Sequence, residues 1–568
     1  MSFKKSLDRF FKSNLKRVLF TGLMILILGM VLSCQKKEEA ALLKIGLPEE
    51  PKSLNVWLAT DGNSRKILSQ IYQPLYTREP KTLKIIPWLA LEQPVFNEEK
   101  LTYTVKLRTV KWSDGTDFTS DDVVFTRKLL LDFKIPGHAS KWDVIKKLDA
   151  IDDHTLIFHL KKPSAIFLSR VLTTPIVSKK EWEQIADKAQ KTEKPLGTGP
   201  FMLAEYRKGA YVYMKKNPYF FGTGIKIGDY TLGPYIDSIL FKIYGTSDVA
   251  VLALKKGDID MFWWEIQPGY IKDLKTQPRI EVFLNEKSAL YYMGFNLRRP
   301  PFDDKILRQA IATLIDKEFI LTRILQNYGS SMHSIIPSGN TFWYNPDVRQ
   351  YGVGVKDEDR FKTAHEMLKK AGYTWDKEPV ISENGIVEGQ GIRLPDGKPM
   401  DNFVILTPPA DYDPKRAFAG MMIQEWLRKI GMPAFARPMS FNSLLDRVKG
   451  KHDFDAFILG YGKLDLDPDY LRTFFYSENN KPRGWNMSGY TNPHFDKIAK
   501  KQLSVIDEEQ RKKLIWEMQA ILMEDVPYIP LYNPHILEAV CKDRVNGWVE
   551  AVDGIGNIWS LCMVKKNN

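Results

Sequence analysis

Two hydrophobic periods alternate along this chain, and their order constrains the fold more than any other feature. Residues 101–108 (LTYTVKLR) place Leu, Tyr, Val and Leu on one face and Thr, Thr, Lys and Arg on the other, which predicts a half-buried strand. Apolar residues at helical spacing predict helices in 304–315, 363–371 and 418–430. The last of these ends before Gly431, a residue type that commonly terminates helices. Because strand and helix patterns mix throughout, we expect several α/β domains.

Size and charge limit the class of protein. The chain has 568 residues, of which 44% are hydrophobic, so it can bury more than one core and we expect two to four domains. Its net charge is +13, and residues 1–33 account for five of these charges. A basic surface can indicate nucleic acid or anionic lipid, but the long Lys/Arg runs typical of such surfaces do not occur. We therefore expect a solvated surface and no nucleic-acid partner.

The N-terminus carries the strongest local signal. A basic segment precedes the apolar run Val18–Leu32, which is short for a membrane-spanning helix of about 20 residues and fits the apolar region of a secretory signal. The run ends in VLSC, and polar residues follow Cys34 at once, as in a bacterial lipoprotein cleavage box. We expect removal of residues 1–33 and lipidation of Cys34, which would hold an exported protein on the periplasmic or extracellular face of a membrane. An uncleaved anchor or a chance Cys is the alternative.

Motifs of common enzymes do not occur in the sequence. It contains no G-x-x-x-x-G-K-[ST], H-E-x-x-H or G-x-S-x-G, and its eight histidines are scattered. The glycine-rich 197–201 (GTGPF) precedes a strand-like run and not a helix, which favours a tight turn over a phosphate loop. We therefore expect no enzyme activity, metal or cofactor. A disulfide between Cys541 and Cys562 is permitted in an exported protein, and the sequence leaves this question open.

The stretch KWSDGTDFTSDDVVFT concentrates four aspartates, which suggests a metal site, an acid/base pair or local structure. Ser113–Gly115 has the composition of a turn. Thr119 is a good N-cap for a helix that starts at Ser120, and Asp121 and Asp122 would lie near the positive end of its dipole. The spacing of Thr119 and Asp122 also fits a capping box. We therefore interpret the acidic residues as structural.

Eight segments carry a resemblance to a known family. In order along the chain they are YTVKLRTVKWSDGTDFTSDDVVFT, GTGPFMLAEYRKGAYVYMKKNPYF, LALKKGDIDM, YMGFNLRRPPFDDKILRQAIATLIDK, MLKKAGY, DPDYLRTFF, NMSGYTNPHFDKI and VPYIPLYNP. They resemble the conserved blocks of family 5 of the bacterial extracellular solute-binding proteins, the dipeptide- and oligopeptide-binding type. The resemblance spans about residues 43–550, nearly all of the mature chain.

The resemblance implies a bilobal α/β fold of the periplasmic-binding-protein type, with a subdomain inserted in the first lobe. The first lobe would comprise 43–75, 197–293 and 528–568, the inserted subdomain 76–196, and the second lobe 294–527. In such proteins the lobes close over a ligand about a hinge, and the ligand shifts the population toward the closed state.

The resemblance also implies a function. The protein would be the substrate-binding lipoprotein of an ABC importer, which captures di- or oligopeptides and delivers them to a separate permease and ATPase. We expect it to act as a monomer. Three alternatives stay open: a non-peptide solute such as a metal chelate or sugar, an adhesion or signalling role at the cell surface, and an exported enzyme on the same scaffold.

The predicted ligand site centres on LGYGKLDLDPDY. In peptide binders of this family, the segment before D-P-D supplies main-chain groups and an aromatic residue, then an Asp that pairs with the peptide α-amine. Gly460 and Tyr461 match the first two positions. Counted back from Asp467, the amine-pairing position falls on Leu464, and Asp465 follows it. Either a one-residue slip lets Asp465 pair with the amine, or this protein does not bind a free α-amine in that way.

Three further residues complete the predicted site. Trp485 and Asn486 belong to the next family block, where a role in packing is the alternative. Trp263 and Trp264 lie in a strand-like pair, of which we expect one to face the cleft and the other the core. The polar segment 375–401, with a hairpin at its Asp-Gly pair, would either shape the cleft mouth or decorate the surface.

Overall fold

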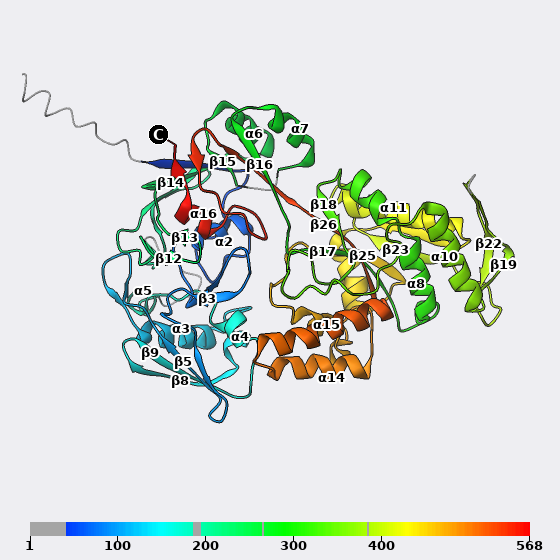
Figure 1. Ribbon diagram of the computed structural model, residues 1–568, viewed down its shortest axis with the longest axis horizontal. Helices are drawn as coiled ribbons and strands as arrows, with labels where there is room; N and C mark the ends of the chain where they lie inside the picture. The colour runs from blue at the N-terminus through cyan, green and yellow to red at the C-terminus, as the bar shows by residue number, and fades with distance from the viewer. Residues whose placement is uncertain (1–40, 186–194, 264–265, 383–384, 568) are drawn as a thin grey trace, which may run out of the picture. The chain divides into compact units, whose positions relative to one another are not determined.

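The computed structural model describes residues 41–185, 195–263, 266–382 and 385–567 (Figure 1). The predicted signal peptide (residues 1–33) and the lipidation site Cys34 lie outside the described residues, so both stay predictions. Residues from Leu43 onward form one compact unit.

A seven-stranded sheet forms the first lobe, in the order β10-β11-β14-β1-β15-β27-β16. Its strands are β1 (Leu42–Leu47), β10 (Phe201–Arg207), β11 (Tyr211–Lys216), β14 (Ser238–Ile243), β15 (Met261–Phe262), β16 (Ile280–Asn285) and β27 (Ile536–Cys541). Strand β1 pairs in parallel with β15, whereas β27 pairs in antiparallel with β15 and β16, so segments from both ends of the chain meet in one sheet. The helices of this lobe are α2 (Gly62–Leu68), α6 (Ser247–Lys256), α7 (Pro268–Thr276) and α16 (Ile558–Met563). Two short strand pairs accompany them, β12 (Lys226–Ile227) with β13 (Tyr230–Thr231) and β28 (Val545–Asn546) with β29 (Lys565–Lys566).

The inserted subdomain has its own four-stranded antiparallel sheet, β4-β5-β9-β8. Its strands are β4 (Val95–Asn97), β5 (Thr102–Lys106), β8 (Ile145–Asp152) and β9 (Thr155–Leu160), with the hairpins β2 (Tyr76–Arg78)–β3 (Ile85–Pro87) and β6 (Val110–Lys111)–β7 (Asp117–Phe118). Its helical segments are α3 (Ser120–Asp132), α4 (Ala139–Trp142), the π-helical turn η1 (Phe167–Val171) and α5 (Lys179–Trp182). The predicted strand at 101–108 is confirmed as β5, with Tyr103 and Val105 buried.

The acidic KWSDGTDFTSDDVVFT stretch is structural, as predicted. Asp114 accepts from the backbone N–H of Thr116 at 3.0 Å in the turn between β6 and β7, where Gly115 has a φ of +85°. Thr119 caps α3, and Asp122 accepts from the backbone N–H of Thr119 at 3.0 Å in a capping box. These carboxylates therefore satisfy backbone groups that would otherwise lack partners.

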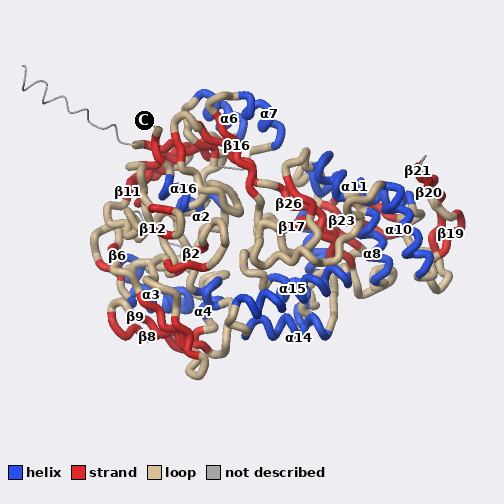
Figure 2. Tube along the Cα trace, in the orientation of Figure 1, coloured by secondary structure: helices blue, strands red, loops and turns tan. Residues whose placement is uncertain are grey.

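A six-stranded sheet, β18-β26-β17-β25-β23-β24, forms the second lobe. Its strands are β17 (Leu290–Phe295), β18 (Gly329–Ser331), β23 (Phe403–Thr407), β24 (Ala434–Pro438), β25 (Ala456–Tyr461) and β26 (Tyr528–Pro534). Its helices are α8 (Lys305–Leu314), α9 (Lys317–Phe319), α10 (Asp357–Lys370), α11 (Pro414–Lys429), α12 (Phe441–Leu445), α13 (Tyr470–Phe475), α14 (Pro493–Lys501) and α15 (Glu508–Asp525). Figure 2 shows α14 and α15 side by side along this lobe. The three predicted helices are confirmed as α8, α10 and α11. The last two begin earlier than their apolar pattern, since three acids open α10 and Asp413 caps α11.

The polar segment at 375–401 lies at the outer side of the second lobe. Strand β19 (Thr374–Lys377) pairs with β22 (Gln390–Arg393), and β20 (Val380–Ser382) pairs with β21 (Gly385–Val387) between them. These strands lie beside α10, away from the first lobe (Figure 1). The predicted Asp-Gly turn is confirmed, with Gly397 at a φ of +82°. This segment decorates the surface and does not line the region between the lobes.

The chain crosses between the two large sheets at 286–289, after β16, and again at His535, between β26 and β27. The sequence had assigned 290–293 and 528–534 to the first lobe, whereas β17 and β26 pair with each other inside the second sheet. The difference has a simple cause. Residues 528–541 are almost continuously apolar and buried, so no pattern marks the point where the chain leaves one sheet for the other.

The open question about the cysteines has an answer in the structure. Cys541, at the end of β27, and Cys562, in α16, are both buried free thiols. Cys541 packs in the apolar core of the first lobe with Phe262 and Ile259, and burial raises its pKa to about 11. No disulfide between these two cysteines therefore cross-links the first lobe, which is held together by packing.

Lys317 gives the second lobe a testable dependence on pH. Its side chain is buried, its ammonium group donates to the Met332 carbonyl oxygen at 2.7 Å, and burial lowers its pKa from 10.5 to about 7. Between these two values the unfolded chain binds the proton and the folded chain releases it. Stability therefore rises as the pH increases from about 7 toward 10, by up to about 1.4 kcal/mol per pH unit.

We expect Lys317→Met to remove this contribution. Urea unfolding at several pH values between about 7 and 9 measures it as the difference in slope between the wild type and the variant. Lys362→Met, at an exposed lysine of α10, is the control and should keep the wild-type slope. Equal slopes for all three proteins would contradict a deprotonated Lys317.

Candidate functional site

The segment LGYGKLDLDPDY runs from the end of β25 across a loop into α13. The loop is held by its own acids. Asp465 accepts from the backbone N–H of Asp467 at 3.0 Å, and Asp467 accepts from the backbone N–H of Asp469 at 3.0 Å. Such bonds between an Asp and the backbone two residues on stabilise turns. The alternate spacing of the three aspartates therefore fixes the shape of the loop.

Asp467 is anchored in a buried ion pair. Two nitrogen atoms of Arg511, from α15, lie 2.8 Å from its two carboxylate oxygens, and both side chains are only 2% exposed. The Ser169 hydroxyl of η1 donates to the same carboxylate at 2.7 Å. Burial alone would raise the pKa of Asp467, but the Arg511 guanidinium outweighs burial and holds this pKa well below its ordinary value. Asp467 is thus an ionised support of the loop.

Asp469 joins the loop to the inserted subdomain. Its buried carboxylate accepts two hydrogen bonds from Arg472 and one from Gln502, each at 2.8 Å. Arg170 of η1 approaches the same carboxylate at 3.3 Å. This approach of Arg170 and the hydrogen bond from Ser169 to Asp467 hold the inserted subdomain against the second lobe.

Asp465 differs from its neighbours because its side chain is 40% exposed. One carboxylate oxygen lies 3.8 Å from Nε of Arg170, too far for a hydrogen bond. Leu464, by contrast, belongs to the buried core of the second lobe, and both of its backbone polar groups bond Ser288. The Leu464 side chain is therefore buried and apolar, whereas the Asp465 carboxylate is exposed to solvent.

Tyr461 and Trp485 lie close together on the second lobe. The Tyr461 ring stacks on Phe474 with a centroid distance of 4.5 Å, and the Trp485 ring lies 6.4 Å from that of Tyr461. Trp485 is 44% exposed, with the Lys449 ammonium 3.3 Å from its ring centroid. Gly460 serves packing, because a Cβ there would lie 2.5 Å from the Tyr291 ring. The exposed edge of this aromatic group is therefore Trp485.

Asn486 is fully buried and its amide is occupied. The Nδ2 group donates to the carbonyl oxygens of Phe475, Tyr476 and Tyr490. Its Oδ1 accepts from the backbone N–H of Tyr490 and from the Ser488 hydroxyl. The structure thus accounts for Asn486 as a framework residue of the second lobe, where no capacity of the amide is left for a solute.

Trp263 lies apart from these residues, in the first lobe directly after β15, and it is buried. The Lys66 ammonium of α2 lies 5.5 Å from its ring centroid. Burial lowers the pKa of Lys66 and raises that of Glu538 on β27, and each charge opposes the shift of the other. Trp263 therefore packs beside a half-buried lysine. The neighbouring Trp264 lies outside the described residues.

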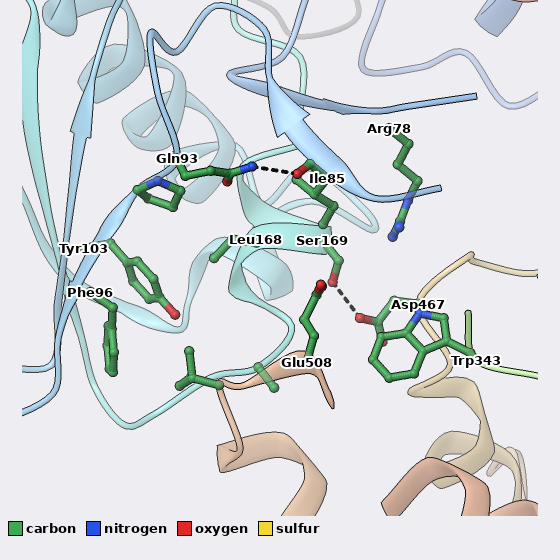
Figure 3. A pocket seen from close by; sticks show the side chains of 13 residues that line it. Arg78, Ile85, Gln93, Phe96, Tyr103, Leu168, Ser169, Trp343, Asp467 and Glu508 are labelled. Carbon is green, nitrogen blue, oxygen red and sulfur yellow. Dashed lines mark hydrogen bonds between the residues drawn. The ribbon is translucent and has the colours of Figure 1, made fainter. Parts of the chain in front are cut away.

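A small cavity of about 180 Å³ marks where the inserted subdomain meets the second lobe (Figure 3). Figure 3 shows Ser169 pointing toward Asp467, with Arg78 above this bond and Trp343 below it. Burial lowers the pKa of Arg78, and the charge of Asp467 opposes this shift. The cavity is smaller than common ligand pockets of about 300–1,000 Å³. We therefore interpret it as a gap in the packing between the inserted subdomain and the second lobe.

A larger cavity of about 460 Å³ lies on the first lobe and the inserted subdomain. Its polar lining includes Ser69, Gln73, His138 and Lys141. Burial lowers the pKa of His138 to about 4, and Lys141 adds to the shift, so the imidazole is neutral. Burial also lowers the pKa of Lys141, while the charge of Asp465 opposes this shift. The volume suits a small solute, and Lys141 links this cavity to the exposed acid of the loop.

The sequence did not identify the residues whose side chains interact with the buried carboxylates of the loop, namely Ser169, Arg170 and Arg511. Nothing in the local sequence distinguishes them, since Arg511 stands among other charged residues in EEQRKK. The one available signal was the loop itself, because buried carboxylates require cationic partners. Which cations these are depends on how η1 and α15 pack against the loop.

A family model described as bacterial extracellular solute-binding proteins, family 5 middle, matches residues 84–483. The chain belongs to this family. The resemblance inferred from the sequence blocks is thereby confirmed.

Two relatives within the family bear names of peptide binders. The oligopeptide-binding protein AppA of Bacillus subtilis (strain 168) is 28% identical over 517 residues, which cover 89% of this chain and 88% of the relative. The dipeptide-binding protein of Escherichia coli (strain K12) is 26% identical over 536 residues, with 89% of this chain and 91% of the relative covered.

The fold of this family 5 protein matches solved structures. HbpA2 from Haemophilus parasuis superposes with a TM-score of 0.76 at 22% identity, with 93% of this chain and 100% of the other covered. The predicted mixed α/β bilobal fold is confirmed by such matches. Within the described residues, no helix combines the length and apolar character needed to cross a membrane.

The Asp467–Arg511 pair leads to a prediction about stability. Arg511→Met leaves the Asp467 carboxylate buried without its guanidinium, and we expect a loss of about 3–5 kcal/mol in the free energy of unfolding. Urea unfolding measures this loss. Lys513→Met, at an exposed residue of the same helix, is the matched control and should change stability little. An Arg511→Met protein as stable as this control would show that the pair does not hold the loop.

Proposed function

We propose that this family 5 protein captures peptides, from dipeptides to oligopeptides, between its two lobes and delivers them to the permease of an ABC importer. The observation that carries the proposal is the exposed Asp465 carboxylate, on a loop whose other two acids are fully compensated. A peptide ammonium group is a natural partner for such a carboxylate. The names of the relatives support the same class of solute.

Closure of the lobes follows from the two chain crossings. Segment 286–289 and His535 are short connections between the large sheets, and such connections can absorb the rotation of one lobe against the other. A peptide that touches both lobes favours the closed state by its additional contacts there. The permease and ATPase then supply transport, for which this chain needs no catalytic group.

Asp465 can bind an α-amine better than it binds Arg170. Nε of Arg170 stands at 3.8 Å, whereas a charged N–H···O bond to a small ammonium group has a length of about 2.8 Å. Arg170 keeps its contact with Asp469 when the amine arrives. In this proposal Trp485 and Tyr461 offer an aromatic surface to the peptide, while Gly460, Asn486 and Trp263 shape the lobes that present it.

Asp465→Ala tests the role of this carboxylate. We expect peptide affinity to fall by about 10- to 100-fold, because a charged hydrogen bond to the α-amine is lost. Calorimetry with di- to pentapeptides measures the change. N-acetylation of the peptide should weaken binding to the wild type by a similar factor and leave the Asp465→Ala protein unaffected. Unchanged affinity of the variant would remove Asp465 from the site.

A non-peptide solute is the second candidate, and one observation favours it. The family position that pairs with the amine in peptide binders is Leu464 here, and its side chain is buried in the core. Native mass spectrometry of the purified protein decides between the candidates, since it identifies the solute that co-purifies. A defined non-peptide solute, together with no binding of any peptide, would overturn the peptide proposal.

We also propose that Cys34 carries the lipid anchor that holds the protein at the membrane surface. We expect Cys34→Ala to move the exported protein from the membrane fraction to the soluble fraction, because the lipid chains attach to this sulfur. Cell fractionation with an immunoblot measures the change. Ser33→Ala keeps a small residue before the cysteine and should stay with the membrane. A Cys34→Ala protein that stays with the membrane would contradict the anchor.

A further inference from the structure

A third cavity, of about 690 Å³, lies between the inserted subdomain and the second lobe. Its charged lining consists of Lys141, Lys161, Lys162, Arg170, Arg472 and Asp143. The backbone N–H of Ala165 donates to the carbonyl oxygen of Leu503 at 2.7 Å at this junction. The cavity is therefore bounded by a direct contact between the two parts, and its lining carries five cations against one acid.

Three of the five cations have carboxylate partners. Lys161 pairs with Asp143 at 2.8 Å. Arg472 bonds Asp469 at 2.8 Å, and Arg170 approaches the same carboxylate at 3.3 Å. Even so, the buried Nε atom of Arg170 has no hydrogen-bond partner among the described residues. These three cations are nevertheless compensated in charge.

Lys141 and Lys162 are not compensated in this way. Among the described residues, no carboxylate oxygen lies within the 4.0 Å limit of an ion pair from either ammonium group. Lys141 is partly buried, so its charge is poorly solvated, and Arg170 lies close enough to repel it. A partly enclosed cavity with unbalanced positive charge attracts an anion, and an oxyanion accepts hydrogen bonds from several such groups at once.

We propose that this cavity binds a carboxylate of the captured solute, so that the protein selects peptides with an acidic residue near the N-terminus. The inference rests on the proposed function, since it assigns a specificity to the same peptide site. Arg170 supplies the geometric link, because its Nε lies 3.8 Å from the Asp465 carboxylate and the same side chain lines the cavity. A peptide with its amine at Asp465 therefore has the cavity beside its first side chains.

The cavity also couples the acidic group to closure. Lys141 and Lys162 belong to the inserted subdomain, whereas Arg472 belongs to α13 of the second lobe. A carboxylate between them contacts both parts at once, and these contacts exist together only when the two parts meet. Binding of an acidic peptide therefore favours the closed arrangement more than binding of its neutral analogue.

Calorimetry with matched peptide pairs tests the inference. Each pair, from dipeptides to pentapeptides, differs only by Glu or Gln at the first or second position. We expect the wild type to bind the Glu peptide about tenfold more tightly, a difference typical of one charged hydrogen bond. The Lys141→Met and Lys162→Met double variant should lose this preference because its affinity for the Glu peptide falls. Lys146→Met, at an exposed lysine of β8 in the same subdomain, should keep the preference.

Each outcome of this experiment is decisive. Equal binding of Glu and Gln peptides by the wild type overturns the inference and leaves the proposed function standing. A preference that survives in the double variant overturns it as well, because the carboxylate then binds elsewhere. If no peptide binds, the proposed function fails, and titration with inorganic phosphate alone decides whether the cavity is a site for free anions. Phosphate binding that is lost in the double variant would show such a site, and an absence of binding would dismiss the cavity.

Discussion

A buried ion pair between Asp467 and Arg511 is the interaction on which the rest of the site depends. It joins the loop after β25 to helix α15, and both side chains are withdrawn from water. Two charges in such a place are tolerated only with good geometry and additional hydrogen bonds, which Ser169 supplies from the inserted subdomain. The pair therefore fixes the loop within its lobe and gives the subdomain a surface to bind.

The three acids of this loop are bonded to different extents, and Asp465 accepts a hydrogen bond from the backbone N–H of Asp467. Asp469 is bonded as completely as Asp467, whereas Asp465 stays half exposed near Arg170. The difference follows from position, because the first acid of the series lies where the loop has just left the core. The depth at which the backbone places each of the three acids thus sets how far its carboxylate is exposed.

The inserted subdomain takes part in the region between the lobes. Its segment η1 contacts the loop of the second lobe, and α4 contributes Lys141 to the cavity at this junction. A two-lobed binder closes about its chain crossings, and here the subdomain supplies the charged surface that meets the second lobe. Cations outnumber acids on that surface.

The sequence by itself determined the local structure and the family. Alternating and helical periods predicted β5, α8, α10 and α11, and the composition of the acidic KWSDGTDFTSDDVVFT stretch predicted a turn and a capped helix, because these features depend on residues close in the chain. The sequence blocks also indicated the bilobal fold. They did not predict where the chain passes from β26 to β27, since both strands are apolar and buried.

Only the tertiary structure decided the chemistry of the site. The sequence left open whether Asp465 pairs with an α-amine or the protein does not bind a free α-amine in that way, and the structure adds that Leu464 is buried and Asp465 is exposed. It offered Asn486 as a ligand group, whereas the fold occupies that amide with backbone bonds. The partners of the loop come from segments about 40 and 300 residues away. Ion pairs between such distant segments leave no periodic signal in a sequence, because they depend on how whole lobes pack and not on local spacing.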